Sequence, residues 1–320
     1  MNIVGRLKAR AREVGARIVL PEGDDPRVQD AAVQLAHEGL VTPILLTLAP
    51  DELPEMLSEV VVIEPTADPR FESFVQAYVE KRKHKGMTAE KAAKIMGQTV
   101  PFGAMLVARG DADGCVAGAT HATSDVLRAG LQIIGMAEGV SVASSSFLMI
   151  LPDGRPLTYG DCGMVPNPNA EQLSQIALAT AKTHELLTGE EPVVAMLSFS
   201  TKGSAKHPDV DKVRTATELA QAAAPDMAID GELQFDAAWV ASIGERKAPG
   251  SNVVGRANVF IFPTLDAGNI AYKITERLGN AQALGPLIQG LARPMHDLSR
   301  GCQAEDIFVV SLISAIQARS

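Results

Sequence analysis

The segment from Pro294 to Cys302, followed by Asp306, holds the residue types that an anion-binding site needs. Arg300 offers a planar set of donors that matches phosphate oxygens, and Ser299 adds a hydroxyl donor. Gly301 lets a ligand approach the backbone closely. If a helix begins near Gly301, its first amides face the same anion and Asp306 projects from its first turns. An anion clamp beside a carboxylate base is what an acyl transfer with a phosphate leaving group requires.

The same residues also permit a purely structural interpretation. Ser299 would then be the N-cap of the helix, and Glu305 and Asp306 would complement the helix dipole. A short Ser-Arg-Gly motif does not decide between the two interpretations, since short motifs are only hypotheses. The remainder of the chain has to supply the context.

The composition limits the classes of protein that the chain can belong to. Its 320 residues suffice for about two domains, and 46% hydrophobic residues permit a large core. The formal net charge of −9 argues against nucleic acid as a partner. No apolar run of spanning length and no signal-peptide segment occurs, so we expect no membrane association. The three cysteines form no C-x-x-C pair, which predicts neither zinc nor disulfides and fits a reducing cytoplasm.

Short apolar segments alternate with helical segments along most of the chain, which predicts βαβ units and parallel sheets. We expect a domain crossing around residues 140–150, and a final apolar helix over about 302–317 that packs back on the first domain. Strands are expected at residues 17–23, 42–47, 60–64, 114–118, 192–198, 227–232 and 259–262. Thr88 and Asn169 are predicted as N-caps of helices.

Several long blocks, in order, give the chain a recognisable character. They are Leu20–Asp24, Arg82–Gly86, Lys206–Val213, Ile229–Ala238, Lys247–Ser251, Ala257–Pro263, Ala267–Lys273 and Ser299–Cys302. With these blocks the chain resembles the phosphate acetyltransferase family over essentially its whole length. The resemblance implies an α/β fold with the architecture of isocitrate and isopropylmalate dehydrogenases: two domains, mostly parallel sheets flanked by helices, and an active site in the interdomain cleft. We therefore expect a discontinuous first domain of residues 1–142 plus 303–320, and a second domain of residues 143–302.

The resemblance further implies a reaction and its participants. Acetyl phosphate and coenzyme A would give acetyl-CoA and phosphate, reversibly, by direct attack of the coenzyme A thiolate in a ternary complex. Coenzyme A would be a substrate, no metal or other cofactor would be needed, and the enzyme would be a cytoplasmic homodimer.

By the same resemblance, three residues are catalytic. Asp306 would take the proton of the coenzyme A thiol, which requires partial burial because an unperturbed aspartate has a pKa of about 4. Arg300 would hold the phosphoryl group as it leaves, and Ser299 would donate a hydrogen bond to the carbonyl or phosphate oxygen. The structural alternative for Arg300 is a surface salt bridge.

Further residues are predicted to bind substrate. Arg27, Arg82 and Arg128 would contact the phosphates of coenzyme A or acetyl phosphate, although the basic cluster around Arg82 could equally be a solvated face. Gly301 and Cys302 would lie against the substrate. A covalent acyl-enzyme on Cys302 would need a base such as His296, and we favour direct transfer because the acceptor is itself a thiol. His296 stands where the family is expected to carry an amide residue.

Three alternatives remain at this point. A phosphate butyryltransferase would share the chemistry but differ in its acyl pocket. A non-catalytic acetyl-CoA-sensing module would share the fold, but it would be free to lose Ser299, Arg300 and Asp306. A metal-dependent dehydrogenase would need a carboxylate cluster and a nucleotide site, and no G-x-G-x-x-G opens a helix after a strand here.

Overall fold

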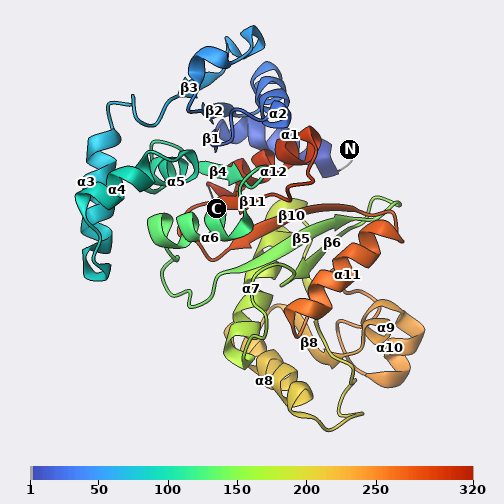
Figure 1. Cartoon of the computed structure of the whole chain (residues 1–320). Coiled ribbons are helices and arrows are strands. Elements are labelled where there is room, and N and C mark those ends of the chain that lie inside the picture. Colours follow the sequence, from blue (N-terminus) through green and yellow to red (C-terminus); the bar gives the residue numbers. More distant parts are fainter. Residues whose placement is uncertain (1–2, 320) are drawn as a thin grey trace. The chain divides into compact units, whose positions relative to one another are not determined.

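The structure is a computed structural model that describes residues 3–319 (Figure 1). The chain divides into two compact units, the first formed by Met1–Glu138 with Leu291–Ser320 and the second by Gly139–Gly290. The sequence placed the boundaries near residues 142 and 302. The difference is largest at the second boundary, because residues 291–302 belong to the first unit.

The first unit is built on a five-stranded sheet in the order β11-β4-β1-β2-β3, in which every pair is parallel. Its strands are β1 (Arg17–Leu20), β2 (Thr42–Leu46), β3 (Val61–Ile63), β4 (Gly114–Ala117) and β11 (Met295–Asp297). Its helices are α1 (Ile3–Val14), α2 (Pro26–His37), α3 (Phe71–Arg82), α4 (Ala89–Met96), α5 (Thr99–Arg109), α6 (Thr123–Ala129) and α12 (Ala304–Gln317), with short helical turns at Pro50–Glu52, Glu55–Leu57, Lys83–Lys85 and Gly130–Ile134.

The two faces of this sheet are covered by different helices. Gly103 of α5 lies against the side chains of Val19 and Cys115, whereas Gly114 faces Ser314 of α12. Helix α12 also packs against α1 and α2. The final apolar helix therefore completes the first unit, as the sequence predicted.

Strand β11 was not expected from the sequence. Its three residues pair in register with Cys115, Val116 and Ala117 of β4, and all three are buried. The sequence hides this strand because two of its residues, His296 and Asp297, are polar. The pairing also explains why the segment around β11 belongs to the first unit.

The second unit contains a six-stranded sheet in the order β10-β5-β6-β9-β7-β8, in which only the pairs of β5 are antiparallel. Its strands are β5 (Ser144–Ile150), β6 (Pro156–Gly160), β7 (Val193–Leu197), β8 (Ala228–Leu233), β9 (Val259–Ile261) and β10 (Gln282–Gln289). Its helices are α7 (Ala170–Thr188), α8 (Pro208–Ala223), α9 (Phe235–Trp239), α10 (Ala241–Lys247) and α11 (Leu265–Arg277). One core lies between the sheet and α7 and α8, and the other between the sheet and α9 to α11.

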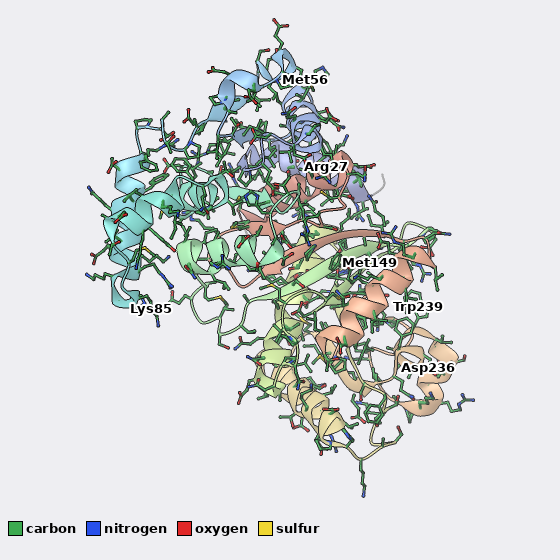
Figure 2. All side chains as sticks on the ribbon, in the orientation of Figure 1. Arg27, Met56, Lys85, Met149, Asp236 and Trp239 are labelled. Carbon is green, nitrogen blue, oxygen red and sulfur yellow. The ribbon has the colours of Figure 1, made fainter. Side chains whose placement is uncertain are left out.

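The predicted fold class is confirmed: the chain is an α/β protein with two mostly parallel sheets flanked by helices. Thr88 caps α4, and Asn169 forms a capping box with Gln172 at the start of α7, as expected. Among the helices described, none is both long and apolar enough to cross a membrane. Figure 2 shows the side chains, with Arg27 in the first unit and Met149, Asp236 and Trp239 in the second.

Candidate active site

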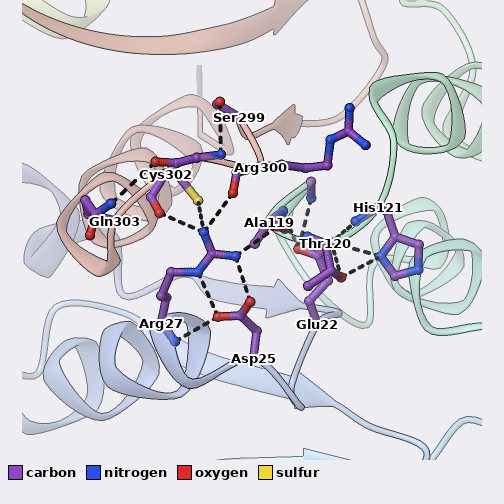
Figure 3. A network of polar contacts seen from close by, with 12 residues as sticks. Glu22, Asp25, Arg27, Ala119, Thr120, His121, Ser299, Arg300, Cys302 and Gln303 are labelled. Carbon is purple, nitrogen blue, oxygen red and sulfur yellow. Dashed lines mark hydrogen bonds and ion pairs between the residues drawn. The ribbon is translucent and has the colours of Figure 1, made fainter.

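Three neighbouring parallel strands of the first unit end at the same edge of the sheet, and the loops that follow them meet there. Strand β1 leads to Glu22, Asp25 and Arg27, β4 leads to residues 118–121, and β11 leads to residues 298–302. In open α/β sheets, ligands bind outside the carboxyl ends of the strands. The Ser299–Arg300–Gly301–Cys302 turn therefore lies where such a fold places its chemistry (Figure 3).

The turn itself presents an unpaired cation to solvent. Ser299 and Arg300 are exposed, and Ser299 Oγ accepts a hydrogen bond from the Gly301 N–H at 3.2 Å. Within residues 3–319 the Arg300 guanidinium has no hydrogen bond or ion pair. It can therefore bind an anion without first breaking a contact, whereas the alternative of a surface salt bridge has no partner for it.

Asp306 lies in the first turn of α12, as predicted. The helix start, however, is neither near Gly301 nor capped by Ser299, the two possibilities that the sequence offered. Helix α12 begins at Ala304, and Gln303, not Ser299, is its N-cap. Asp306 Oδ2 accepts the Gln303 N–H at 2.8 Å, which completes a capping box. The side chain is half-buried.

Arg27 is at the centre of the network in Figure 3 and uses its whole guanidinium within the chain. Nε and Nη2 bind Asp25 at 3.0 and 2.7 Å, and Nη2 also donates to the Ala119 carbonyl at 2.9 Å. Nη1 donates to the carbonyls of Arg300 and Cys302 at 2.9 and 2.8 Å. Arginine has five N–H groups, so none remains for the substrate oxygen that the sequence assigned to Arg27.

Glu22 fixes the loop that follows β4, a function that the sequence did not reveal. The side chain is 5% exposed, and its two oxygens accept the N–H groups of residues 118, 119, 120 and 121. Burial raises the pKa of this carboxyl, but these bonds and the His121 ring outweigh it and bring the pKa to about 2. In return, the hydrogen bond to Glu22 raises the pKa of His121.

A second buried carboxyl, Asp297, lies two residues before Ser299. Thr123 Oγ1, at the start of α6, donates to Asp297 Oδ2 at 2.7 Å, while Oδ1 is buried without a hydrogen-bond partner among the described residues. Burial is the main cause that raises the pKa of Asp297 to about 6. Gly118 must be glycine here, because its φ is +113° and a Cβ would lie 2.5 Å from Asp297 Oδ1.

Arg82 and Arg128 lie in the first unit but outside this network. Burial raises the pKa of Tyr78, and the positive charges of Arg82 and Arg128 both oppose that shift, so both cations lie near the same phenol. Arg128 is exposed and pairs with Asp125 at 2.8 Å. Arg82 is half-buried, and its Nε has no partner within residues 3–319.

The Cys302 thiol is contacted by Arg27 Nη1 at 3.9 Å, and the nearby charge of Asp306 also acts on it. The side chain is 4% exposed, and burial raises the pKa of its thiol to about 11. His296 is fully buried and interacts with Gln317, and burial lowers its pKa to about 4. The geometry therefore does not supply the Cys-His pair that a covalent acyl-enzyme would need.

No group of three or more histidine, cysteine, aspartate or glutamate side chains in residues 3–319 could hold a metal ion. Glu22 lies within the block Leu20–Asp24, which contributes to the family resemblance, but nothing in that block marks the glutamate itself. Nothing in the sequence marked Thr123, which only the fold brings to Asp297.

Comparison with known proteins gives a consistent result. A family described as phosphate acetyl/butaryl transferase matches residues 2–315. A phosphate acetyltransferase of Thermoanaerobacterium thermosaccharolyticum is 47% identical over 329 residues, covering 100% of both chains. A phosphotransacetylase structure from Streptococcus pyogenes superimposes with a TM-score of 0.94 at 45% identity, covering 99% of this chain and 98% of that one. The EutD phosphotransacetylase from Staphylococcus aureus gives a TM-score of 0.89 at 45% identity, with coverage of 98% and 99%.

Proposed function

The chain belongs to the phosphate acetyl/butaryl transferase family, and from that premise we propose the part that each site residue plays in its reaction. It is an acyltransferase that moves the acetyl group reversibly between acetyl phosphate and coenzyme A, giving acetyl-CoA and phosphate. Coenzyme A is a substrate of this reaction. The observation that supports the site best is the exposed, unpaired guanidinium of Arg300 on a turn that leads directly into the half-buried Asp306.

Asp306 is the base in this proposal. Its Oδ2 is occupied by the Gln303 N–H, which orients the carboxylate and leaves Oδ1 to take the proton of the coenzyme A thiol. The resulting thiolate attacks the carbonyl carbon of acetyl phosphate and forms the C–S bond. The bond from that carbon to the bridging oxygen then breaks, and its electron pair leaves with the phosphate.

Arg300 and Ser299 stabilise the leaving group. Negative charge develops on the phosphate as the C–O bond breaks, and the Arg300 guanidinium is placed to bind two of its oxygens. Ser299 Oγ already accepts the Gly301 N–H, so its hydroxyl proton can donate to a carbonyl or phosphate oxygen. Because burial raises the pKa of the Cys302 thiol, and the described residues 3–319 form no Cys-His pair at this turn, transfer proceeds directly between the two substrates in this proposal.

The remaining proposed contacts concern substrate binding. Arg82 and Arg128 contact the phosphates of coenzyme A, which is consistent with two cations near one phenol. Gly301 and Cys302 line the acyl site beside Arg300. Arg27 is left out of the substrate contacts, because its donors are occupied by the chain.

The test is thioester formation from acetyl phosphate and coenzyme A, measured for the wild type, Arg300→Ala and Asp306→Asn. We expect each substitution to lower kcat by roughly 10²–10³-fold. Matched controls are Arg293→Ala, an exposed arginine just before β11, and Glu305→Gln, the neighbouring carboxylate outside the capping box. Controls that lose as much activity as the site variants would contradict the assignment. Turnover with butyryl phosphate alone would change the acyl group but not the site.

We also infer a homodimer that uses α11. Three large apolar residues recur every four positions, Ile270 and Ile274 of α11 and its C-cap Leu278, and are 58%, 52% and 81% exposed. Such a stripe is typical of a contact surface. Sedimentation of the wild type and of Ile274→Lys tests this, since the variant should sediment as a monomer.

A cytoplasmic location is proposed from the three free, buried cysteines and is tested by fractionation of cells.

A further inference from the structure

Three segments that are far apart in the sequence meet at the side chain of Arg27. They are the start of α2, the loop after β4 and the turn after β11 (Figure 3). All three belong to the first unit. Arg27 is therefore the one guanidinium in this network that holds the catalytic turn to the rest of the sheet edge.

The contacts to the turn are made to its backbone. A single nitrogen, Nη1, donates to the carbonyl oxygens of Arg300 and Cys302, the residues on either side of Gly301. Fixing the two carbonyls fixes the Arg300–Gly301 and Cys302–Gln303 peptide planes, which bracket Gly301, a residue with no side chain of its own to restrain it. The direction in which the Arg300 side chain leaves the backbone then depends on Arg27.

The other contacts anchor Arg27 itself. Asp25 binds the Nε and Nη2 edge, and this ion pair holds the pKa of Asp25 below its usual range. Nη2 also donates to the Ala119 carbonyl, in the loop whose amides are held by the buried Glu22. Charge alone cannot reproduce this arrangement, because a lysine ammonium is a point charge without the planar fork.

We propose that Arg27 is a positioning residue, which holds the Ser299–Cys302 turn so that Arg300 meets the leaving phosphate in the productive geometry. The inference rests on the proposed function. In it, Arg27 helps to stabilise the transition state indirectly, by holding Arg300 in place. A ligand of substrate phosphate would instead act mainly on substrate affinity.

The experiment compares Arg27→Lys with a matched control, Arg17→Lys. Arg17 also binds a carboxylate, that of Asp113, with two nitrogens, and it donates to the Gly110 carbonyl. However, Arg17 lies at the start of β1, at the opposite end of the strand from the site loops. We expect Arg27→Lys to lower kcat by about 10²-fold, with the KM values for coenzyme A and acetyl phosphate within about threefold of wild type. Arg17→Lys should leave kcat unchanged.

A double-mutant cycle with Arg300→Ala tests the coupling. If Arg27 acts through Arg300, adding Arg27→Lys to Arg300→Ala should lower kcat by less than about threefold further, because the group being positioned is gone. Independent effects that multiply would overturn the proposal. An increased KM for coenzyme A with unchanged kcat would also overturn it and would restore Arg27 as a substrate ligand.

A readout without turnover separates this inference from the proposed function. Amide exchange at residues 300–303, and the alkylation rate of Cys302 by iodoacetamide, should both rise at least tenfold in Arg27→Lys but not in Arg17→Lys. If the wild type gave no turnover, the proposed function would fail while these rates could still support the positioning. If the wild type were active and the rates were unchanged in Arg27→Lys, the positioning would fail alone.

Discussion

Replacing Glu22 by glutamine should release the loop after β4. The Glu22 carboxylate accepts hydrogen bonds from four backbone N–H groups and from the Thr120 hydroxyl, and it is also hydrogen-bonded to Nδ1 of the His121 ring. Glutamine has the same shape but only one accepting oxygen, so its NH₂ group would face donors. The loss is specific to this loop, because all the hydrogen bonds of the carboxylate within residues 3–319 come from residues 118–121.

The magnitude follows from the pKa of the carboxyl. A fall from 4.5 to about 2 on folding, at about 1.4 kcal/mol per unit, corresponds to roughly 3 kcal/mol of stabilisation at neutral pH. Because the folded pKa is the lower one, this stabilisation is fully present well above pH 4.5 and is lost as the pH falls towards 2. At pH 3.5, about 1.4 kcal/mol of it should already be lost.

Hydrogen exchange measured by mass spectrometry reports on these amides directly. At pH 7, residues 118–121 of Glu22→Gln should exchange roughly 10²-fold faster than in the wild type. At pH 3.5 the ratio between the two proteins should be about tenfold smaller. Glu38→Gln is the matched control: Glu38 is partly exposed and pairs with Lys8, an arrangement worth about 1 kcal/mol at most.

Two results would refute this reasoning. A ratio below about threefold at pH 7 would mean that the loop does not depend on the carboxylate. A large ratio that stays the same at pH 3.5 would mean that the effect comes from the altered shape and not from the charge.

Three further predictions concern the same sheet edge. Asp297→Asn should raise the melting temperature at pH 8 but not at pH 4. The pKa of Asp297 is raised to about 6 in the folded protein, so the wild type becomes less stable as the pH rises from about 4 to 6, whereas the asparagine variant does not. Equal shifts of the melting temperature at both pH values would contradict this. Gly118→Ala should cost about 2 kcal/mol or more in urea unfolding, since its φ is +113° and its Cβ would lie 2.6 Å from the Leu298 nitrogen; a loss below 0.5 kcal/mol would show that the loop adapts. Iodoacetamide at pH 7 should alkylate Cys302 more than tenfold slower than an unfolded peptide, because the thiol pKa is about 11; equal rates would contradict its burial.

The fold was predictable where a local pattern carries the information. Apolar runs of three or more residues marked β1, β2, β4 and β7, and the caps at Thr88 and Asn169 marked two helices. Strand β11 was missed because it is three residues long and partly polar, and only its pairing with β4 makes it a strand.

The catalytic roles assigned to the site residues stay a prediction, but their place in the fold can be compared with the sequence. The sequence singled out Ser299, Arg300 and Asp306, and the structure brings the turn and the start of α12 together. It could not show that Arg27 is saturated, because its acceptors are mostly backbone carbonyls, which carry no sequence signature. The same reason hid Glu22, whose partners are mostly backbone amides nearly a hundred residues further along the chain.

The position of β11 and α12 has a consequence for synthesis on the ribosome. The second unit is translated in full before Leu291 emerges, whereas the first unit still lacks an edge strand and the helix that packs on α1 and α2. During that interval the apolar faces of the early helices have no permanent cover and are open to chaperones or to other nascent chains. The turn between β11 and α12, to which we assign Ser299 and Arg300 of the proposed site, thus forms only when the first unit closes, and a chain that ends before α12 would also lack the proposed base Asp306.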